Sequence, residues 1–141
     1  MVPEINWLAV LLAAVSSMVV GAVWYAKPVF GRRWMALSGI TEADTQKGAA
    51  VPLIITFIVS GFTAAVLAGS AAIAQHFYEG NFFANAVLTS IILWIGFTAS
   101  RMLTHDLFDR RPAALTTLNL AHELVTVVVM GVIIGAFGFP G

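Results

Sequence analysis

Hydrophobic residues fill four long segments of this chain, and polar residues gather in the short connections between them. The apolar segments cover about residues 5–25, 51–74, 82–103 and 113–137. A bilayer core about 30 Å thick takes roughly 20 helical residues to cross. Each segment is long enough for one crossing, so the pattern predicts four transmembrane helices.

The composition supports a membrane protein with a single domain over residues 1–141. Hydrophobic residues make up 60% of the chain and charged residues only 10%, whereas a soluble domain carries about 25% charged residues. Four spans and their connections use this length and leave no room for a soluble domain. The chain contains no cysteine, which excludes disulfides and thiolate metal sites. We therefore expect an all-α integral membrane four-helix bundle without a cofactor.

Basic residues lie in or beside the first and third connections only. Short loops rich in lysine and arginine stay on the cytoplasmic side of a membrane, so both termini are predicted to face outward (N-out, C-out). Because these residues flank membrane spans, anionic lipid head-groups are their expected partners, rather than nucleic acid. The seven basic residues are Lys27, Arg32, Arg33, Lys47, Arg101, Arg110 and Arg111.

The first connection is predicted to contain a short helix that lies in the membrane interface. Pro28 cannot continue a helical hydrogen-bond ladder and is expected to end the first span. Apolar residues then alternate with Arg32 and Arg33, as in an interfacial amphipathic helix. Gly39 is the expected stop of this helix. Residues 41–44 (Thr-Glu-Ala-Asp) resemble a capping box, which predicts that the second helix begins near Thr41 and enters the membrane around Val51.

Small residues recur at helical spacing within three of the predicted spans. Such side chains let helix backbones approach closely, so we expect these faces to pack against other helices and to support a homo-oligomer. The small residues are Ala9, Ala13, Ser17 and Gly21 on the first span, Gly61, Ala65 and Gly69 on the second, and Gly131 and Gly135 on the fourth.

The fourth span carries a polar stripe formed by Asn119, His122, Glu123 and Thr126. Their spacing places all four on one side of a helix. Glu123 lies roughly 15 Å beyond the start of the span, where a charged group costs at least about 2.5 kcal/mol and indicates a functional site. The stripe is interpreted either as a proton, cation or head-group site, or as a structural interhelical hydrogen bond worth about 0.6 kcal/mol.

Other polar residues have weaker chemical interpretations. Arg101, near the exit of the third span, is a candidate ion-pair partner of Glu123 or a contact for a lipid phosphate. His122 and Glu123 begin the zinc motif HExxH, but Thr126 replaces its second histidine, so no metal site is expected. The turn that contains His105 and Asp106 is interpreted as solvated.

The stretch from Gly21 to Met35 resembles an uncharacterised bacterial family of small four-span membrane proteins, domain of unknown function 1761. The shared pattern is a glycine, Trp-Tyr, a proline, Phe-Gly, a basic residue and Trp-Met. The resemblance implies a four-span fold in a bacterial inner membrane and implies no activity. We interpret most of the stretch as an anchor at the inner interface, formed by Trp24, Tyr25, Pro28, Phe30, Arg32, Arg33 and Trp34.

Three functions follow as hypotheses. The leading one is a non-enzymatic structural or accessory membrane component. The alternative is a small proton- or cation-coupled transporter or channel, in which Glu123, His122, Thr63 and Ser100 converge on a hydrated cavity. An enzyme that acts on lipids is disfavoured, because the sequence offers no recognisable nucleophile or metal site.

Overall fold

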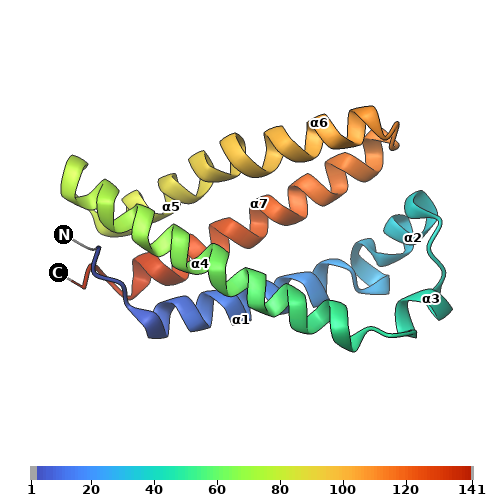
Figure 1. Ribbon diagram of the computed structural model, residues 1–141, viewed down its shortest axis with the longest axis horizontal. Coiled ribbons are helices and arrows are strands. Elements are labelled where there is room, and N and C mark those ends of the chain that lie inside the picture. Colours follow the sequence, from blue (N-terminus) through green and yellow to red (C-terminus); the bar gives the residue numbers. More distant parts are fainter. Residues whose placement is uncertain (1–2, 141) are drawn as a thin grey trace.

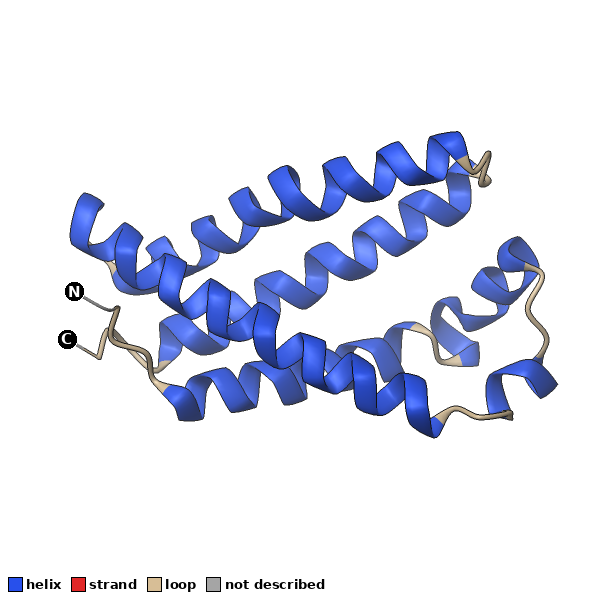
Figure 2. Cartoon of the chain, in the orientation of Figure 1, coloured by secondary structure: helices blue, strands red, loops and turns tan. Residues whose placement is uncertain are grey.

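The protein is a bundle of four long helices, seen in a computed structural model that describes residues 3–140 (Figure 1). All regular secondary structure in this part of the chain is helical (Figure 2). Each long helix is long and apolar enough to cross a membrane, which confirms the predicted all-α membrane bundle. The four are α1 (Trp7–Trp24), α4 (Ala50–Tyr78), a continuous helix formed by α5 (Phe82–Leu93), η2 (Trp94–Ala99) and α6 (Ser100–Phe108), and α7 (Ala113–Ala136).

Two of these helices extend beyond the apolar segments that predicted them. Helix α4 continues to Tyr78, past the predicted end at residue 74. The third helix continues to Phe108 instead of ending at residue 103, and includes the π-helical segment η2. Hydrophobicity marks the part of a helix that crosses a bilayer, whereas hydrogen bonding carries the helix on into polar residues.

The long helices form a closed ring in which α1 contacts α4, α4 contacts α5, α5 contacts α7, and α7 contacts α1. The two ends of the chain and the α4–α5 turn lie at one end of the bundle, called the terminal end here (Figure 1). The first and third connections, with the basic residues, lie at the opposite end, called the basic end. The basic residues therefore gather towards one end of the bundle, together with several acidic partners.

Small side chains make the core in the terminal half. Ala13 is 0% exposed and Met130 1% exposed. On α7, a Cβ added at Gly131 would overlap the hydroxyl of Ser90, and one at Gly135 would lie 2.9 Å from Phe83 Cα. The two glycines thus let α5 and α7 approach closely, as their spacing indicates.

The packing face predicted for α1 is confirmed, whereas the one predicted for α4 packs only in part, because Ala65 lies against the core cluster and Gly61 does not. Ala9, Ala13 and Ser17 are buried on α1. On α4, an added Cβ at Gly61 would meet no atom within 4 Å. The buried residues of α4 lie instead on the neighbouring face, because small size alone does not determine which side of a helix faces its partners; they are Ser60, Ala64, Leu67, Ala68, Ala71 and Ala72.

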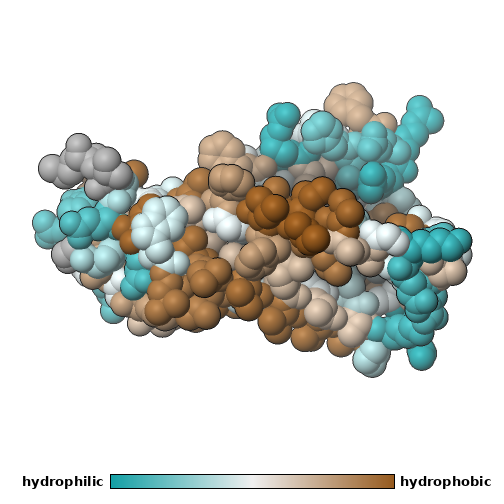
Figure 3. Space-filling view, turned by 60° about the horizontal axis from the view of Figure 1, so that its bottom comes forward, coloured by the Kyte–Doolittle hydropathy of each residue, from teal (hydrophilic) through white to brown (hydrophobic). Residues whose placement is uncertain are grey.

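The outer surface carries an apolar band between polar ends (Figure 3). Helix α4 contributes large exposed side chains to it, such as Ile54, Ile58 and Phe62. An exposed apolar surface of this extent is unfavourable in water and suits the acyl chains of a bilayer.

The first connection folds into three short helices at the basic end: η1 (Lys27–Gly31), α2 (Arg32–Ser38) and α3 (Glu42–Gln46). Helix α1 already ends at Trp24. Pro28 lies in the first turn of η1, where backbone N–H groups have no hydrogen-bond partner within the helix, so a proline is tolerated. The predicted end of the first span at about residue 25 is therefore confirmed within one residue, but Pro28 lies beyond that end and begins η1.

The predicted stop signal and the capping box in this connection are confirmed, but the box starts the short helix α3 and not the second span, which begins separately at Ala50. Gly39 ends α2 in the left-handed conformation, at φ 73°. Thr41 and Asp44 form the capping box at the start of α3. Hydrogen bonds from the Thr41 hydroxyl and backbone N–H to the Asp44 carboxylate hold the pKa of Asp44 below its ordinary value.

Candidate functional site

The aromatic stretch after α1 and the polar stripe of α7 meet in one cluster. The Tyr25 hydroxyl donates a hydrogen bond to Asn119 Oδ1 over 3.0 Å. The two residues are 94 positions apart in sequence. This bond joins the first connection to the middle of the fourth span, so the two groups of residues that the sequence singles out form a single site.

His122 lies against the aromatic side of this cluster. Its ring centroid is 4.9 Å from that of Tyr25 and 6.0 Å from that of Trp24. An added Cβ at Gly21 would lie 3.6 Å from His122 Nε2. This distance is an ordinary van der Waals contact, so His122 packs against α1 at Gly21 but the contact does not itself require a glycine.

Glu123 and Thr126 complete the stripe on α7. Nδ1 of His122 lies 3.3 Å from Glu123 Oε1, and its Nε2 lies 3.5 Å from the hydroxyl of Thr126. Thr126 is buried, whereas the side chain of Glu123 is 39% exposed. The carboxylate is the part of the stripe that a molecule from outside the bundle can reach.

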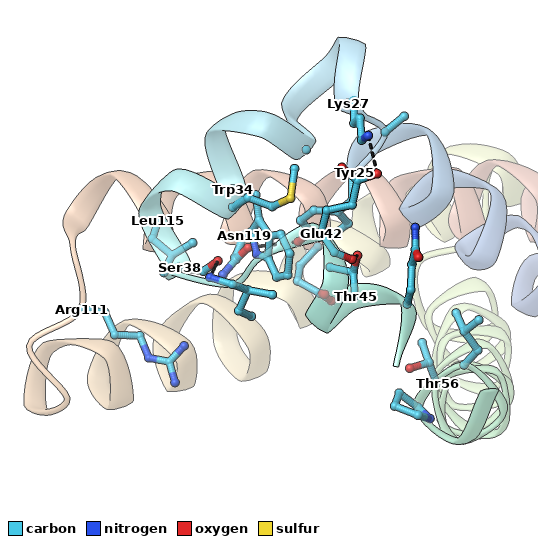
Figure 4. A pocket seen from close by; sticks show the side chains of 18 of the residues that line it. Tyr25, Lys27, Trp34, Ser38, Glu42, Thr45, Thr56, Arg111, Leu115 and Asn119 are labelled. Carbon is cyan, nitrogen blue, oxygen red and sulfur yellow. Dashed lines mark hydrogen bonds and ion pairs between the residues drawn. The ribbon is translucent and has the colours of Figure 1, made fainter. Parts of the chain in front are cut away.

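Glu123 faces a cavity of about 910 Å³ at the basic end, called the vestibule here. The vestibule lies between the first connection and the facing ends of α4, α6 and α7 (Figure 4). Polar and aromatic side chains in its wall include Tyr25, Trp34, Asn119 and Glu123, and Glu123 is the lining residue of α7 farthest from the basic end. A volume of this size is typical of a pocket for a small molecule.

The vestibule ends against the apolar core. The next residues on this side of α7 are Val127, Met130 and Ile134, which are all buried in the core cluster. Thr63 and Thr98 line a separate groove between α4 and the third helix, and Ser100 donates its hydroxyl to Ile95 O. The polar residues proposed for a transport path therefore do not converge on one cavity within the described chain.

The turn at Gly31 positions the aromatic rings of the site. A Cβ on this residue would overlap Tyr25 O and lie 2.9 Å from the carbonyl carbon of Ala26. The chain can therefore fold back closely after α1, and the Trp34 ring packs edge-on against Tyr25 with centroids 5.4 Å apart. The glycine of the Phe-Gly pair thus has a steric role that no larger residue could fill.

The other residues of the predicted anchor lie outside the vestibule. Phe30 packs against Trp24, with centroids 4.5 Å apart. Arg33 lines a second cavity of about 350 Å³, together with Trp24, Phe30 and Thr117. Pro28 and Arg32 are exposed.

Arg101 is also exposed, and it forms no ion pair with Glu123 in the described part of the chain. It does not line the vestibule, whereas Arg111 does. The third-span residue that the sequence offers as a partner for Glu123 is thus not brought to it.

Sequence reasoning missed the role of the turn after α6. Asp106 was expected to be solvated, but it is buried and accepts a hydrogen bond from the Thr116 hydroxyl over 2.7 Å. Arg111 Nε lies 3.6 Å from the same carboxylate. These contacts tie α6 to the start of α7. In the sequence, only the ten-residue separation of Asp106 and Thr116 across a short turn indicates that these two side chains could meet.

Sequence comparison agrees with the architecture. Comparison with curated proteins and with solved structures gives no significant match. The family described as "Protein of unknown function (DUF1761)" matches residues 8–135, which covers all four long helices except a few terminal residues. The chain therefore belongs to this family.

Proposed function

We propose that the protein is a non-enzymatic accessory component of a membrane and that its vestibule binds a small ligand. The observation that carries the proposal is the polar floor of the vestibule, where the hydrogen bond between Tyr25 and Asn119 lies beside the accessible carboxylate of Glu123. Polar groups that converge in a largely apolar pocket are typical of a ligand site.

The chemistry of the floor supports binding rather than catalysis. The Tyr25 hydroxyl is paired with the amide of Asn119, and an amide is not a base that could activate it. Among the described residues, neither His122 nor Glu123 forms a hydrogen bond with this hydroxyl. A nucleophile needs such a base within hydrogen-bond reach. This arrangement favours a role in recognition.

The proposal places the protein in a bacterial inner membrane with both termini outward. Its support is the position of all seven basic residues at the basic end, next to the cytoplasm in this orientation. There Arg32 and Arg33 contact anionic head-groups. Open space beside Gly61 on α4 leaves room for the helix of a second copy.

The orientation can be tested by labelling. A single cysteine in place of Tyr78, at the terminal end, should react with an impermeant reagent only from outside.

Occupancy of the vestibule can be tested by native mass spectrometry of the purified protein. Thr56 lies in the vestibule wall, whereas its neighbour Ile55 is exposed on the outside of α4. We expect a small bound molecule on the wild type and on Ile55→Trp, and its loss from Thr56→Trp, because the indole fills the cavity. Equal occupancy in the two variants, or no bound molecule in any form, would contradict the proposal.

A proton- or cation-coupled transporter is the second candidate. The observation in its favour is the accessible carboxylate of Glu123 within a predicted span. Reconstitution of Glu123→Gln into liposomes tests it. Proton or ion flux equal to that of the folded wild type would remove this candidate.

A further inference from the structure

Four charged side chains line the vestibule, and three of them have partners of opposite fixed charge. Lys27 Nζ lies 2.5 Å from Glu42 Oε1, and Arg111 lies between two aspartates, 3.6 Å from Asp106 and 3.7 Å from Asp109. The fourth, Glu123, has the imidazole of His122 as its only ion-pair neighbour among the described residues and forms no ion pair with lysine or arginine there. The charge left for a ligand to meet is therefore negative.

Aromatic rings lie in the same part of the wall as this carboxylate. Tyr25 and Trp34 both line the vestibule, and their rings are packed edge to face. Tryptophan and tyrosine faces attract organic cations, because the ring quadrupole is negative above the ring. A carboxylate beside two such rings is a combination that selects an ammonium group over an anion.

The outer wall is suited to the rest of an amphiphilic ligand. It is lined by apolar side chains from different elements, including Met35, Leu53, Met102 and Leu115. Leu115, Asn119 and Glu123 recur every four residues on α7, so they form one row that runs from this apolar wall to the carboxylate. The row would hold an alkyl stem with its charged group innermost.

We infer that the vestibule binds an organic ammonium group, with the carboxylate of Glu123 as its counter-ion and Tyr25 and Trp34 as its aromatic walls. The inference rests on the proposed function, since it names the ligand class of the same cavity. The ammonium group belongs either to a soluble amine that enters from the basic end or to the head-group of an aminophospholipid.

The first test is calorimetric titration of the purified full-length protein in a nonionic detergent. The probes are choline and 3,3-dimethylbutan-1-ol, a neutral molecule of nearly the same shape. We expect choline to bind at least about tenfold more tightly, because only choline carries the charge that pairs with Glu123. Equal binding of both probes would overturn the inference.

Matched variants then locate the binding. Glu123→Gln should weaken choline binding about tenfold or more, and Trp34→Leu by about three- to tenfold. Glu79→Gln removes the same charge at the terminal end and should change nothing. Glu123→Gln keeps nearly the same shape, so its thermal unfolding should match the wild type. Choline binding that survives in Glu123→Gln would overturn the inference.

A lipid arm separates the two sources of the ammonium group. The protein is placed in nanodiscs of phosphatidylethanolamine or of phosphatidylglycerol. If the ammonium group belongs to a lipid, phosphatidylethanolamine should occupy the vestibule of the wild type and phosphatidylglycerol should not. Neither lipid should occupy the vestibule of Glu123→Gln. Binding of choline or of the ethanolamine lipid alone supports the inference. If a molecule is displaced by Thr56→Trp but is insensitive to Glu123→Gln, the proposed function stands and the inference fails. If neither that molecule nor the probes bind, both fail.

Discussion

At the terminal end of the bundle, alanines and glycines bring the four long helices into close contact, whereas at the basic end the first connection and the ends of α4, α6 and α7 line a cavity of about 910 Å³. Helix α7 shows the contrast within one element. Met130, Gly131 and Ile134 are buried in the terminal half, while Asn119 and Glu123 line the vestibule. The change occurs at Thr126 and Val127, which are buried where the polar stripe meets the core.

Close packing and the proposed binding site therefore lie in opposite halves of the bundle. In lipid, helix association depends on close packing, which small residues permit and large ones prevent. The terminal half satisfies this requirement and can hold the ring of helices together. The first connection can then occupy the basic end with aromatic and polar side chains, whose contacts are weaker and leave space for a ligand.

The largest expected effect is on the terminal half. Gly131→Ala places a Cβ on the Ser90 hydroxyl and 3.1 Å from Ala86 O, so it should reduce the free energy of unfolding by about 1–3 kcal/mol, as overpacking does. Gly61→Ala is the matched control, because its Cβ meets open space. Thermal unfolding in detergent measures both. Equal losses in the two variants would show that α5 and α7 are not held by this contact.

A smaller effect is expected at the basic end from Gly31→Ala. The overlap with Tyr25 O should displace the η1 turn and, with it, the Trp34 ring. We expect ligand binding in the vestibule to be lost while the long helices remain folded, since the terminal core is untouched. Circular dichroism and native mass spectrometry report the two properties. Retention of the bound molecule by Gly31→Ala would contradict the claim that the turn at Gly31 positions the site.

Tyr25→Phe should have a modest effect on stability. It removes the hydrogen bond to Asn119 and keeps the ring, and such bonds between membrane helices are worth about 0.6 kcal/mol. Tyr78→Phe, at an exposed tyrosine, is the control. A loss in unfolding free energy as large as that of Gly131→Ala would mean that the cluster, and not the small-residue core, holds the bundle together.

The smallest effect concerns the short helix α3. Because the pKa of Asp44 is lowered in the folded state by its bonds with Thr41, the stabilisation is present above the ordinary pKa and is lost as the pH falls through the lowered one. Hydrogen exchange over residues 41–46 should therefore show less protection in acid, after correction for intrinsic exchange. Thr41→Ala should weaken this pH dependence. Unchanged protection from neutral to acidic pH would contradict the assignment.

Much of the fold could be predicted from the sequence, since the length of each apolar segment and the turn residues Gly39 and Thr41 act locally. Which face of α4 is turned towards the bundle could not be predicted. Gly61 and Ala64 are both small, and only tertiary contacts decide which of them is buried. For the site, the stripe and the motif could be found separately. That the stripe and the motif form one site could not be predicted, because their contact depends on how α1 and α7 face each other and local sequence patterns do not determine this.

The central claim is that the basic end contains a water-accessible vestibule whose wall includes Thr56. Because the chain has no cysteine, single cysteines can be placed at positions 55 and 56, at nearly the same depth on α4 but on different faces. The rates of modification by a water-soluble thiol reagent are the measurement. The account predicts fast reaction for Thr56→Cys and slow reaction for Ile55→Cys in a bilayer. Equal rates at the two positions would contradict it.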